Sequence, residues 1–183
     1  MMIKPIFFVL LCYSLLMNIS WAAPHSHPDF QSTRDDIELK STATATWLAF
    51  IEVYDAALYA QPDAQAENVL NGNGPFSLEI LYKVSLSKSQ LIEGADVALG
   101  RQHSEQQRAS YQSDVDALHA FYQDVTEGDR FRLDIAPTDG LSLFFNDQLV
   151  YQNTSIDFAR YYVGLWLAEN PLSDRVRLGL LDW

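Results

Sequence analysis

Apolar and polar residues alternate with period two in the first half of the chain, a pattern typical of half-buried strands. The alternation begins at residues 37–40, resumes in the β-branched and aromatic run 46–59, and is most regular at 76–82. The turn-forming segment 71–75, NGNGP, precedes the last of these runs. We therefore predict strands at 37–40, 46–59 and 76–82.

The pattern changes to helical spacing after these strands. Residues 87–90, SKSQ, have the form of a capping box, and apolar residues then recur at helical spacing through Leu99. A second cap at residues 113–116 predicts a helix whose apolar stripe runs to Val125. Residues 102–108 between them are polar, which fits either a loop or an exposed helix.

Period two returns further along the chain and predicts three short strands, at 131–135, 141–145 and 149–151. Asp139-Gly140 is a strong hairpin signal between the first two, and Asn146-Asp147 indicates the next turn. These strands form a meander.

Two helices are predicted at the C-terminal end. Residues 154–157 cap an aromatic-rich helix that runs through Leu167 and ends before Pro171, and Ser173 caps a short terminal helix. The order of strands, helices, meander and helices predicts an α+β fold, with a large antiparallel sheet and helices packed on one face.

The N-terminal residues have the layout of a secretory signal peptide. A basic residue, Lys4, precedes an apolar run that is too short to span a bilayer, and Ser20 and Ala22 fit a cleavage site. We predict a signal peptide at 1–22, a periplasmic or secreted protein, and no stable membrane anchor after cleavage. An uncleaved anchor is the alternative.

The domain itself is predicted to begin after a polar lead-in. Residues 23–36 include two prolines and show no periodicity, so we expect a disordered segment there and one domain at 37–183. The single cysteine, Cys12, lies in the predicted signal peptide. Disulfides and cysteine metal sites are therefore not expected.

Composition and charge narrow the classes of function. The 183 residues are 48% apolar and 13% aromatic, as in a globular protein, and carry a net charge of −12. This acidity excludes a nucleic-acid partner and disfavours an anionic membrane surface. His25-Ser26-His27 could form an amino-terminal metal site, but Pro24 has no N–H to lose, so a flexible polar tail is favoured. His103 and His119 lack metal-ligand spacing, and no cofactor-binding motif is present, so neither a metal nor a cofactor is expected. Proton-transfer enzymes and binding proteins remain.

Asp55 has the most unusual local context, because a regular strand would place it on the face of Ile51 and Val53. A buried carboxylate in a cleft is a candidate acid or base. We favour the alternative, a bulge or bend where Asp55 accepts backbone or tyrosine hydrogen bonds. Four tyrosines are candidates for lining a ligand cavity, or for the core: Tyr54, Tyr59, Tyr82 and Tyr162.

Several of these segments resemble the bacterial chalcone isomerase-like domain. They are FIEVYDAALY at 50–59, EGDRF at 127–131, the Asn146 hairpin, and DFAR through GLWL at 157–167. The resemblance covers residues 37–181 and implies an open-faced β-sandwich with an apolar cleft between sheet and helices.

Plant chalcone isomerases cyclise a chalcone with an arginine, a threonine, a tyrosine, an asparagine and a late hydroxyl residue. The resemblance puts these positions at Thr42, Tyr54, Leu86, Glu93 and Ala159. None keeps the catalytic residue, so the donors needed for a developing oxyanion are missing.

Related plant proteins bind fatty acids and clamp the carboxylate with an arginine and a tyrosine. Many bacterial relatives keep an arginine where this chain has Trp47. The resemblance therefore favours a neutral lipid, or an acid held by tyrosine hydroxyls alone. If acids bind best, Arg160 is the first candidate for the positive charge.

The leading hypothesis is an exported, non-catalytic binder of an apolar or amphipathic small molecule. Its cleft would be lined by Trp47, Tyr54, Tyr59, Tyr82, Ala159 and Tyr162. One alternative is an isomerase or intramolecular lyase with a rearranged site using Tyr54, Asp55 or Glu93. The other is a ligand-free module whose helix face meets a protein partner.

Overall fold

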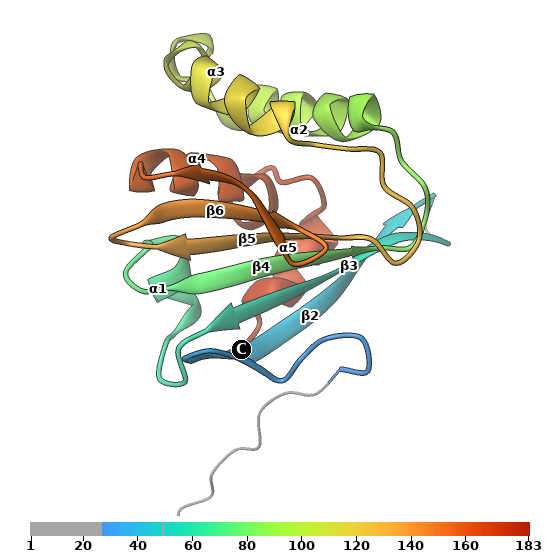
Figure 1. Cartoon of the computed structure of the whole chain (residues 1–183), viewed down its shortest axis with the longest axis vertical. Helices are drawn as coiled ribbons and strands as arrows, with labels where there is room; N and C mark the ends of the chain where they lie inside the picture. Colours follow the sequence, from blue (N-terminus) through green and yellow to red (C-terminus); the bar gives the residue numbers. More distant parts are fainter. Residues whose placement is uncertain (1–26, 49) are drawn as a thin grey trace, which may run out of the picture.

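One seven-stranded antiparallel sheet forms the centre of the computed structural model, which describes residues 27–48 and 50–183 (Figure 1). Its strands follow one another in chain order from β1 to β7. They are β1 (Thr33–Arg34), β2 (Ile37–Trp47), β3 (Ile51–Ala60), β4 (Phe76–Tyr82), β5 (Arg130–Ala136), β6 (Gly140–Phe145) and β7 (Gln148–Asn153).

The longer helices pack on one face of this sheet, which we call the inner face. Helix α4 lies against β5 and β6, α5 lies against β2, and α2 and α3 form a further layer over α4 (Figure 1). The helices are α1 (Ala66–Leu70), α2 (Lys88–Gln102), α3 (Glu105–Ala120), α4 (Ile156–Leu167) and α5 (Asp174–Leu181). This architecture confirms the α+β prediction. Within the described residues, no helix combines the length and apolar character needed to cross a bilayer.

The predicted strand 46–59 was wrong at one place, because a hairpin turn divides it. Strand β2 ends at Trp47 and β3 begins at Ile51, with Leu48 in the turn at a φ of +50°. The turn has none of the glycine, proline, asparagine or aspartate residues that normally mark one. The apolar sequence therefore read as one continuous strand.

The second capping prediction was also misplaced. Helix α3 begins after Ser104, whose hydroxyl accepts from the backbone N–H of Gln107 while the Gln107 side chain reaches back. The predicted cap at 113–116 lies inside this helix, which ends at Ala120. The buried Val125, assigned to its stripe, instead pairs with Leu86 in a β-bridge.

Residues 27–36, here called the N-terminal strap, differ from the disordered lead-in that was predicted at 23–36. The strap contains β1 and lies on the outer face of the sheet, where Phe30 is buried with Leu39, Tyr59 and Leu81. The apolar Phe30 anchors a segment whose other residues are mostly polar. The predicted signal peptide, residues 1–22, lies outside the described residues.

Alternation along β3 and β4 separates the two faces. Tyr54, Ala56 and Leu58 belong to the main core under the helices, whereas Ala57 and Tyr59 belong to the smaller cluster beneath the strap. Adjacent residues of β3 therefore lie on opposite faces of the sheet, and each candidate site residue lies on the face that its position in the strand sets.

Candidate functional site

A cavity of about 140 Å³ lies between the inner face of β3 and β4 and the helices α2 and α4. It is partly open to solvent, and we call it the Tyr54 cavity. Its lining is Val53, Tyr54, Ile80, Tyr82, Leu86, Gln90, Leu91, Gly94, Ala95, Tyr122, Leu165, Trp166 and Leu172. Within the described part of the chain, this lining includes no charged side chain.

Two polar atoms make this apolar cavity chemically distinctive. The Tyr54 hydroxyl and the Trp166 indole N–H are both buried, and neither makes a hydrogen bond of good geometry with a described residue, although the indole lies near enough to the hydroxyl to act on its pKa. Burial raises the pKa of Tyr54, opposed by the neighbouring Trp166 indole, so the hydroxyl is neutral at physiological pH. A buried donor without a partner costs stability, and a ligand oxygen here would satisfy it.

Behind the cavity wall, the tyrosines are fully paired. The hydroxyls of Tyr122 and Tyr162 lie 2.6 Å apart, and Nε2 of His119 lies 2.9 Å from the Tyr162 hydroxyl. Burial raises the pKa of Tyr122 to about 12 and that of Tyr162 well above its usual value. These groups are therefore neutral structural partners, and only Tyr122 reaches the cavity.

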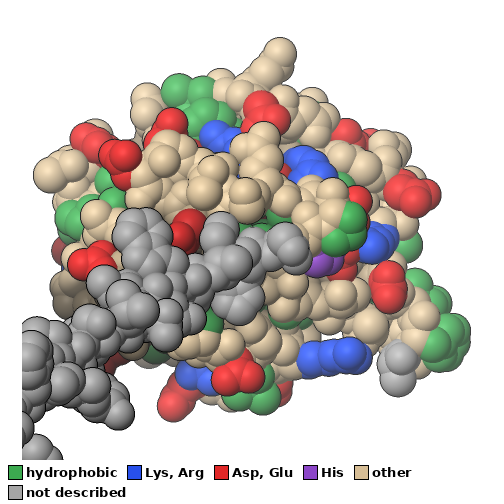
Figure 2. All heavy atoms as spheres, turned by 90° about the horizontal axis from the view of Figure 1, so that it is seen from below, with side chains coloured by type: hydrophobic (Ala, Val, Ile, Leu, Met, Phe, Trp, Pro, Cys, Tyr) green, Lys and Arg blue, Asp and Glu red, His purple; other side chains and the backbone are tan. Residues whose placement is uncertain are grey.

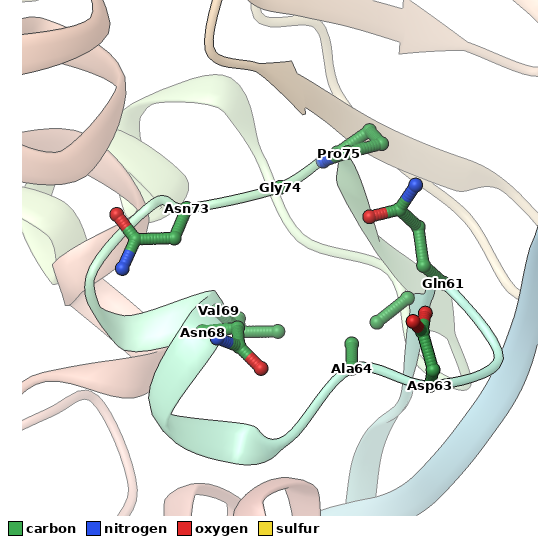
Figure 3. Close-up of a pocket in the computed structure, with 9 residues that line it drawn as sticks. Gln61, Asp63, Ala64, Asn68, Val69, Asn73, Gly74 and Pro75 are labelled. Carbon is green, nitrogen blue, oxygen red and sulfur yellow. The ribbon is translucent and has the colours of Figure 1, made fainter.

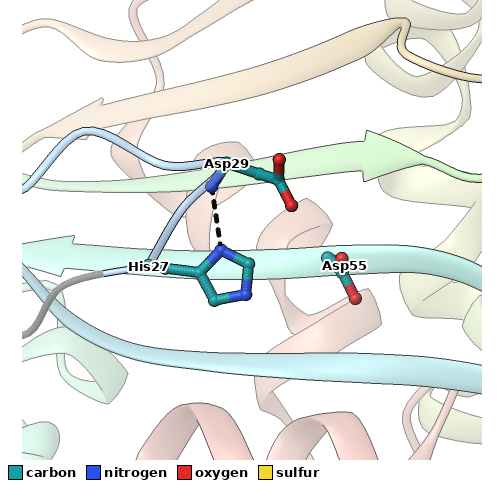
Figure 4. A group of neighbouring side chains, drawn as sticks. All are labelled: His27, Asp29 and Asp55. Carbon is teal, nitrogen blue, oxygen red and sulfur yellow. Dashed lines mark hydrogen bonds between the residues drawn. The ribbon is translucent and has the colours of Figure 1, made fainter.

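A candidate metal cluster lies on the outer face, where His27 and Asp29 of the strap approach Asp55 of β3 (Figure 4). One ligand atom from each falls within 4.8 Å of the others. However, Lys83 Nζ lies 2.7 Å from Asp55, and the Asp55 carboxylate and its acidic neighbours raise the pKa of this lysine. A cation would have to displace the ammonium, so the cluster is a weaker candidate than the cavity.

A second pocket of about 160 Å³ lies around α1, at the opposite end of β3 and β4 (Figure 3). Gln61, Asn68 and Asn73 surround it with amide groups, and Asp63 is its one ionisable lining residue among those described. The face seen in Figure 2 mixes acidic and basic side chains without a broad basic patch. Neither the pocket around α1 nor this face indicates a particular ligand or reaction.

Comparison with known proteins agrees with the fold. Residues 25–182 match the family described as chalcone isomerase-like. The chain belongs to the chalcone isomerase-like family. It is also similar to the crystal structure of the Arabidopsis thaliana fatty-acid binding protein AtFAP1, with a TM-score of 0.66 and 14% identity over 84% of this chain and 91% of that chain. No curated protein matches the sequence.

In this chalcone isomerase-like protein, the structure brings only some of the predicted binding residues together. Tyr54 and Tyr82 line the cavity. Tyr59 lies on the outer face, Trp47 is exposed at the β2–β3 turn, and Ala159 is buried in the core outside the lining. Tyr162 lies behind the wall, as described above.

The three catalytic candidates, Tyr54, Asp55 and Glu93, do not lie together in one site. Asp55 points to the outer face, opposite to Tyr54, and accepts a 2.7 Å hydrogen bond from the Thr44 hydroxyl. The strand pairing is regular at Asp55, so no bulge lies at that residue. The register shift lies two residues away, where Val53 of β3 is the extra residue between the pairs Ala45–Tyr54 and Thr46–Glu52. Glu93 is exposed on α2.

Other residues were not anticipated. Trp166 and Gly94 line the cavity, from α4 and α2 respectively. Trp166 could have been predicted from its spacing, because it lies four residues after the candidate Tyr162 and residues four apart share a helix face. Arg160, the candidate cation, lies against Gly72 and pairs with Asp157 at 3.6 Å, outside the cavity lining.

Proposed function

We propose that this protein binds an apolar or amphipathic, lipid-like small molecule in the Tyr54 cavity. The observation that carries the proposal is the combination of apolar walls with two buried donors that lack partners, Tyr54 and Trp166. The resemblance of the fold to AtFAP1, a fatty-acid binding protein by its name, is consistent with this ligand class.

The polar end of the ligand is expected to be a neutral oxygen. Both Tyr54 and Trp166 offer donors, which suits a hydroxyl, carbonyl or ester oxygen as the acceptor. A buried carboxylate would lose its hydration without a cation in the described lining. Long-chain alcohols and monoglycerides should therefore bind at least as well as the matching free fatty acids.

The size of the cavity limits how much of the ligand enters. At about 140 Å³ it is close to an engineered cavity of about 150 Å³ that holds benzene. A head group with a short apolar stem fits inside, and the rest of a long chain would pass out on the more exposed side of the lining, which includes Gln90, Leu91 and Leu172.

Two glycines of helix α2 provide a matched test. A Cβ at Gly94 would meet Leu172 Cδ2 at an ordinary 3.8 Å, so Gly94→Leu is tolerated by the backbone and fills the cavity. A Cβ at Gly100 meets nothing within 4 Å, so Gly100→Leu is the control. Both changes remove the helix-interior penalty of glycine, about 1 kcal/mol.

The measurement is thermal unfolding with and without dodecanol or monolaurin. A ligand at 100 times its dissociation constant stabilises the folded state by about 2.7 kcal/mol. Wild type and Gly100→Leu should show this shift, and Gly94→Leu should lose it. An undiminished shift in Gly94→Leu would place binding elsewhere, and the absence of any shift in wild type would favour the interaction module.

We also propose that the protein is exported. Support comes from the signal-peptide layout of residues 1–22 and from a family match that begins at residue 25, after the predicted cleavage point. Amino-terminal sequencing of the natural protein should return Ala23. A soluble cytoplasmic protein that begins at Met1 would contradict export.

A further inference from the structure

The tip of the β2–β3 hairpin exposes three large apolar side chains. We use the name hairpin tip for Trp47, Leu48 and Phe50, which are 61%, 60% and 76% exposed. Strand β4 ends at Tyr82, opposite Tyr54, so the start of β3 extends beyond its neighbour (Figure 1). A projection of hydrophobic side chains is visible at the right-hand edge of Figure 2.

The backbone at the tip argues that these residues are not there to make the turn. Leu48 has a φ of +50°, a conformation that glycine or asparagine adopts at lower cost than leucine. A turn selected for stability would carry one of those residues instead. An apolar side chain kept at a strained and exposed position indicates a contact with something outside the protein.

The chemistry of the tip points to a lipid bilayer. The segment from Trp47 to Ile51 has no charged side chain, and its only side-chain hydrogen-bonding group is the Trp47 indole N–H. At the base of the tip, Lys83 lies 2.7 Å from Asp55 and 3.6 Å from Glu52, so two carboxylates share one ammonium and the base is net acidic. Exposed tryptophan and phenylalanine suit the interfacial region of a membrane, and the acidic base disfavours an anionic one.

The overall charge selects the kind of lipid. With a net charge of −12, the protein is repelled by an anionic surface, so a zwitterionic one is the compatible partner. The tip is also continuous with the cavity, because Val53 and Tyr54 of its own strand line the cavity wall. The cavity and the hairpin tip therefore lie at the same end of the sheet.

We propose that the hairpin tip inserts into the interfacial region of a zwitterionic bilayer and holds the cavity mouth at its surface. Docking stands on the tip alone, whereas its use for loading a ligand rests on the proposed lipid-binding function. An apolar molecule would then pass between bilayer and cavity with little exposure to water.

Phosphatidylcholine vesicles test this with Trp47 as the reporter. Vesicles with brominated acyl chains should quench wild-type emission, and the quenching should be reduced in Trp47→Phe, so that the difference between the two chains isolates Trp47. All variants share the same full chain, so residues 1–22 contribute equally to each.

The double variant Leu48→Asn/Phe50→Ser removes apolar surface and keeps the reporter. Asparagine tolerates the positive φ at position 48, so thermal stability should be unchanged or slightly higher. Vesicle partitioning attributable to the tip should fall by on the order of tenfold to a hundredfold. Leu70→Ser, at an exposed position near the opposite end of the sheet, should have no effect.

The outcomes separate docking from ligand binding. Lack of Trp47 quenching, or equal quenching in the double variant, would overturn the docking proposal while leaving the Gly94→Leu experiment intact. A concentration-dependent dimer that the double variant abolishes, without Trp47 quenching, would instead assign the tip to a second copy of the chain. Loss of vesicle binding in Leu70→Ser would also contradict the assignment.

Discussion

The buried polar groups on the two faces of strands β3 and β4 differ in whether they have hydrogen-bond partners. On the outer face, the buried Glu79 carboxylate lies 2.6 Å from Arg34 and 2.8 Å from Arg130, and it accepts from the Tyr59 hydroxyl at 3.3 Å. On the inner face, the Tyr54 hydroxyl has no partner within the described chain. The same two strands thus carry one satisfied and one unsatisfied polar site.

This difference separates a structural role from a binding role. A buried charge that already has its partners holds segments together, as Arg34 does when it ties the strap to β4. A buried donor beside an opening lowers stability until something else supplies the acceptor. The outer face therefore stabilises the fold, and the inner face is the candidate binding surface.

The strongest test of the outer face is Glu79→Ala. The change leaves two arginines without their shared carboxylate, one of them mostly buried. We expect the free energy of unfolding to fall by about 3–5 kcal/mol in urea denaturation, as for other broken buried pairs. Arg160→Ala is the control, because both members of its pair are largely exposed and its loss should change little. Similar effects in the two variants would remove the contrast between the faces.

The next test removes the apolar anchor of the strap. Phe30 is 6% exposed among Leu39, Ala57, Tyr59 and Leu81. Phe30→Ala should lower the free energy of unfolding by about 3 kcal/mol, and the strap should become the first site of proteolytic cleavage. Wild-type stability together with a protected strap would mean that ion pairs alone hold this segment.

The strap also shows where sequence reasoning reached its limit. The single apolar Phe30 gives no periodicity, and the acidic partner of Arg34 lies 45 residues away in the sequence, at Glu79. Only the folded sheet brings them together. The strands at 76–82 and 131–135 were predictable because their alternation is regular and turn residues precede them.

The candidate site was predictable only in part, for a similar reason. Tyr54 and Tyr82 were predicted because the amphipathic ring of tyrosine suits a ligand cavity, and both line it. Tyr59, on the same strand, was included because the sequence does not specify which face the helices cover. Trp166 and Gly94 enter through helix packing, and no local pattern encodes the gap that they leave against the sheet.

Smaller changes in the free energy of unfolding are expected when the unpaired Tyr54 hydroxyl or the paired Tyr162 hydroxyl is removed. Tyr54→Phe removes an unsatisfied group and should raise the free energy of unfolding by about 1 kcal/mol, while weakening binding of a long-chain alcohol. Tyr162→Phe deprives both Tyr122 and His119 of a partner and should lower it by about 1–3 kcal/mol. Chemical denaturation without ligand, followed by ligand titration, measures both. A loss of stability in Tyr54→Phe would show that its hydroxyl is already satisfied.

The smallest expected effect is the dependence of stability on pH through His119. Burial lowers the pKa of this histidine, although Asp96 and Asp116 oppose the shift. The neutral ring is therefore favoured in the folded state, and as the pH falls through about 6.5 the unfolded chain takes up the proton first. Stability should decline below that pH until the folded protein also binds the proton.

His103, whose pKa burial also lowers, contributes in the same direction, so His119→Gln should reduce the decline without abolishing it. Urea midpoints measured between pH 7.5 and 5 test this, with His103→Gln as the companion variant. An unchanged decline in His119→Gln would mean that His119 titrates alike in the folded and unfolded chains, and that the Tyr162 contact does not depend on its neutral form.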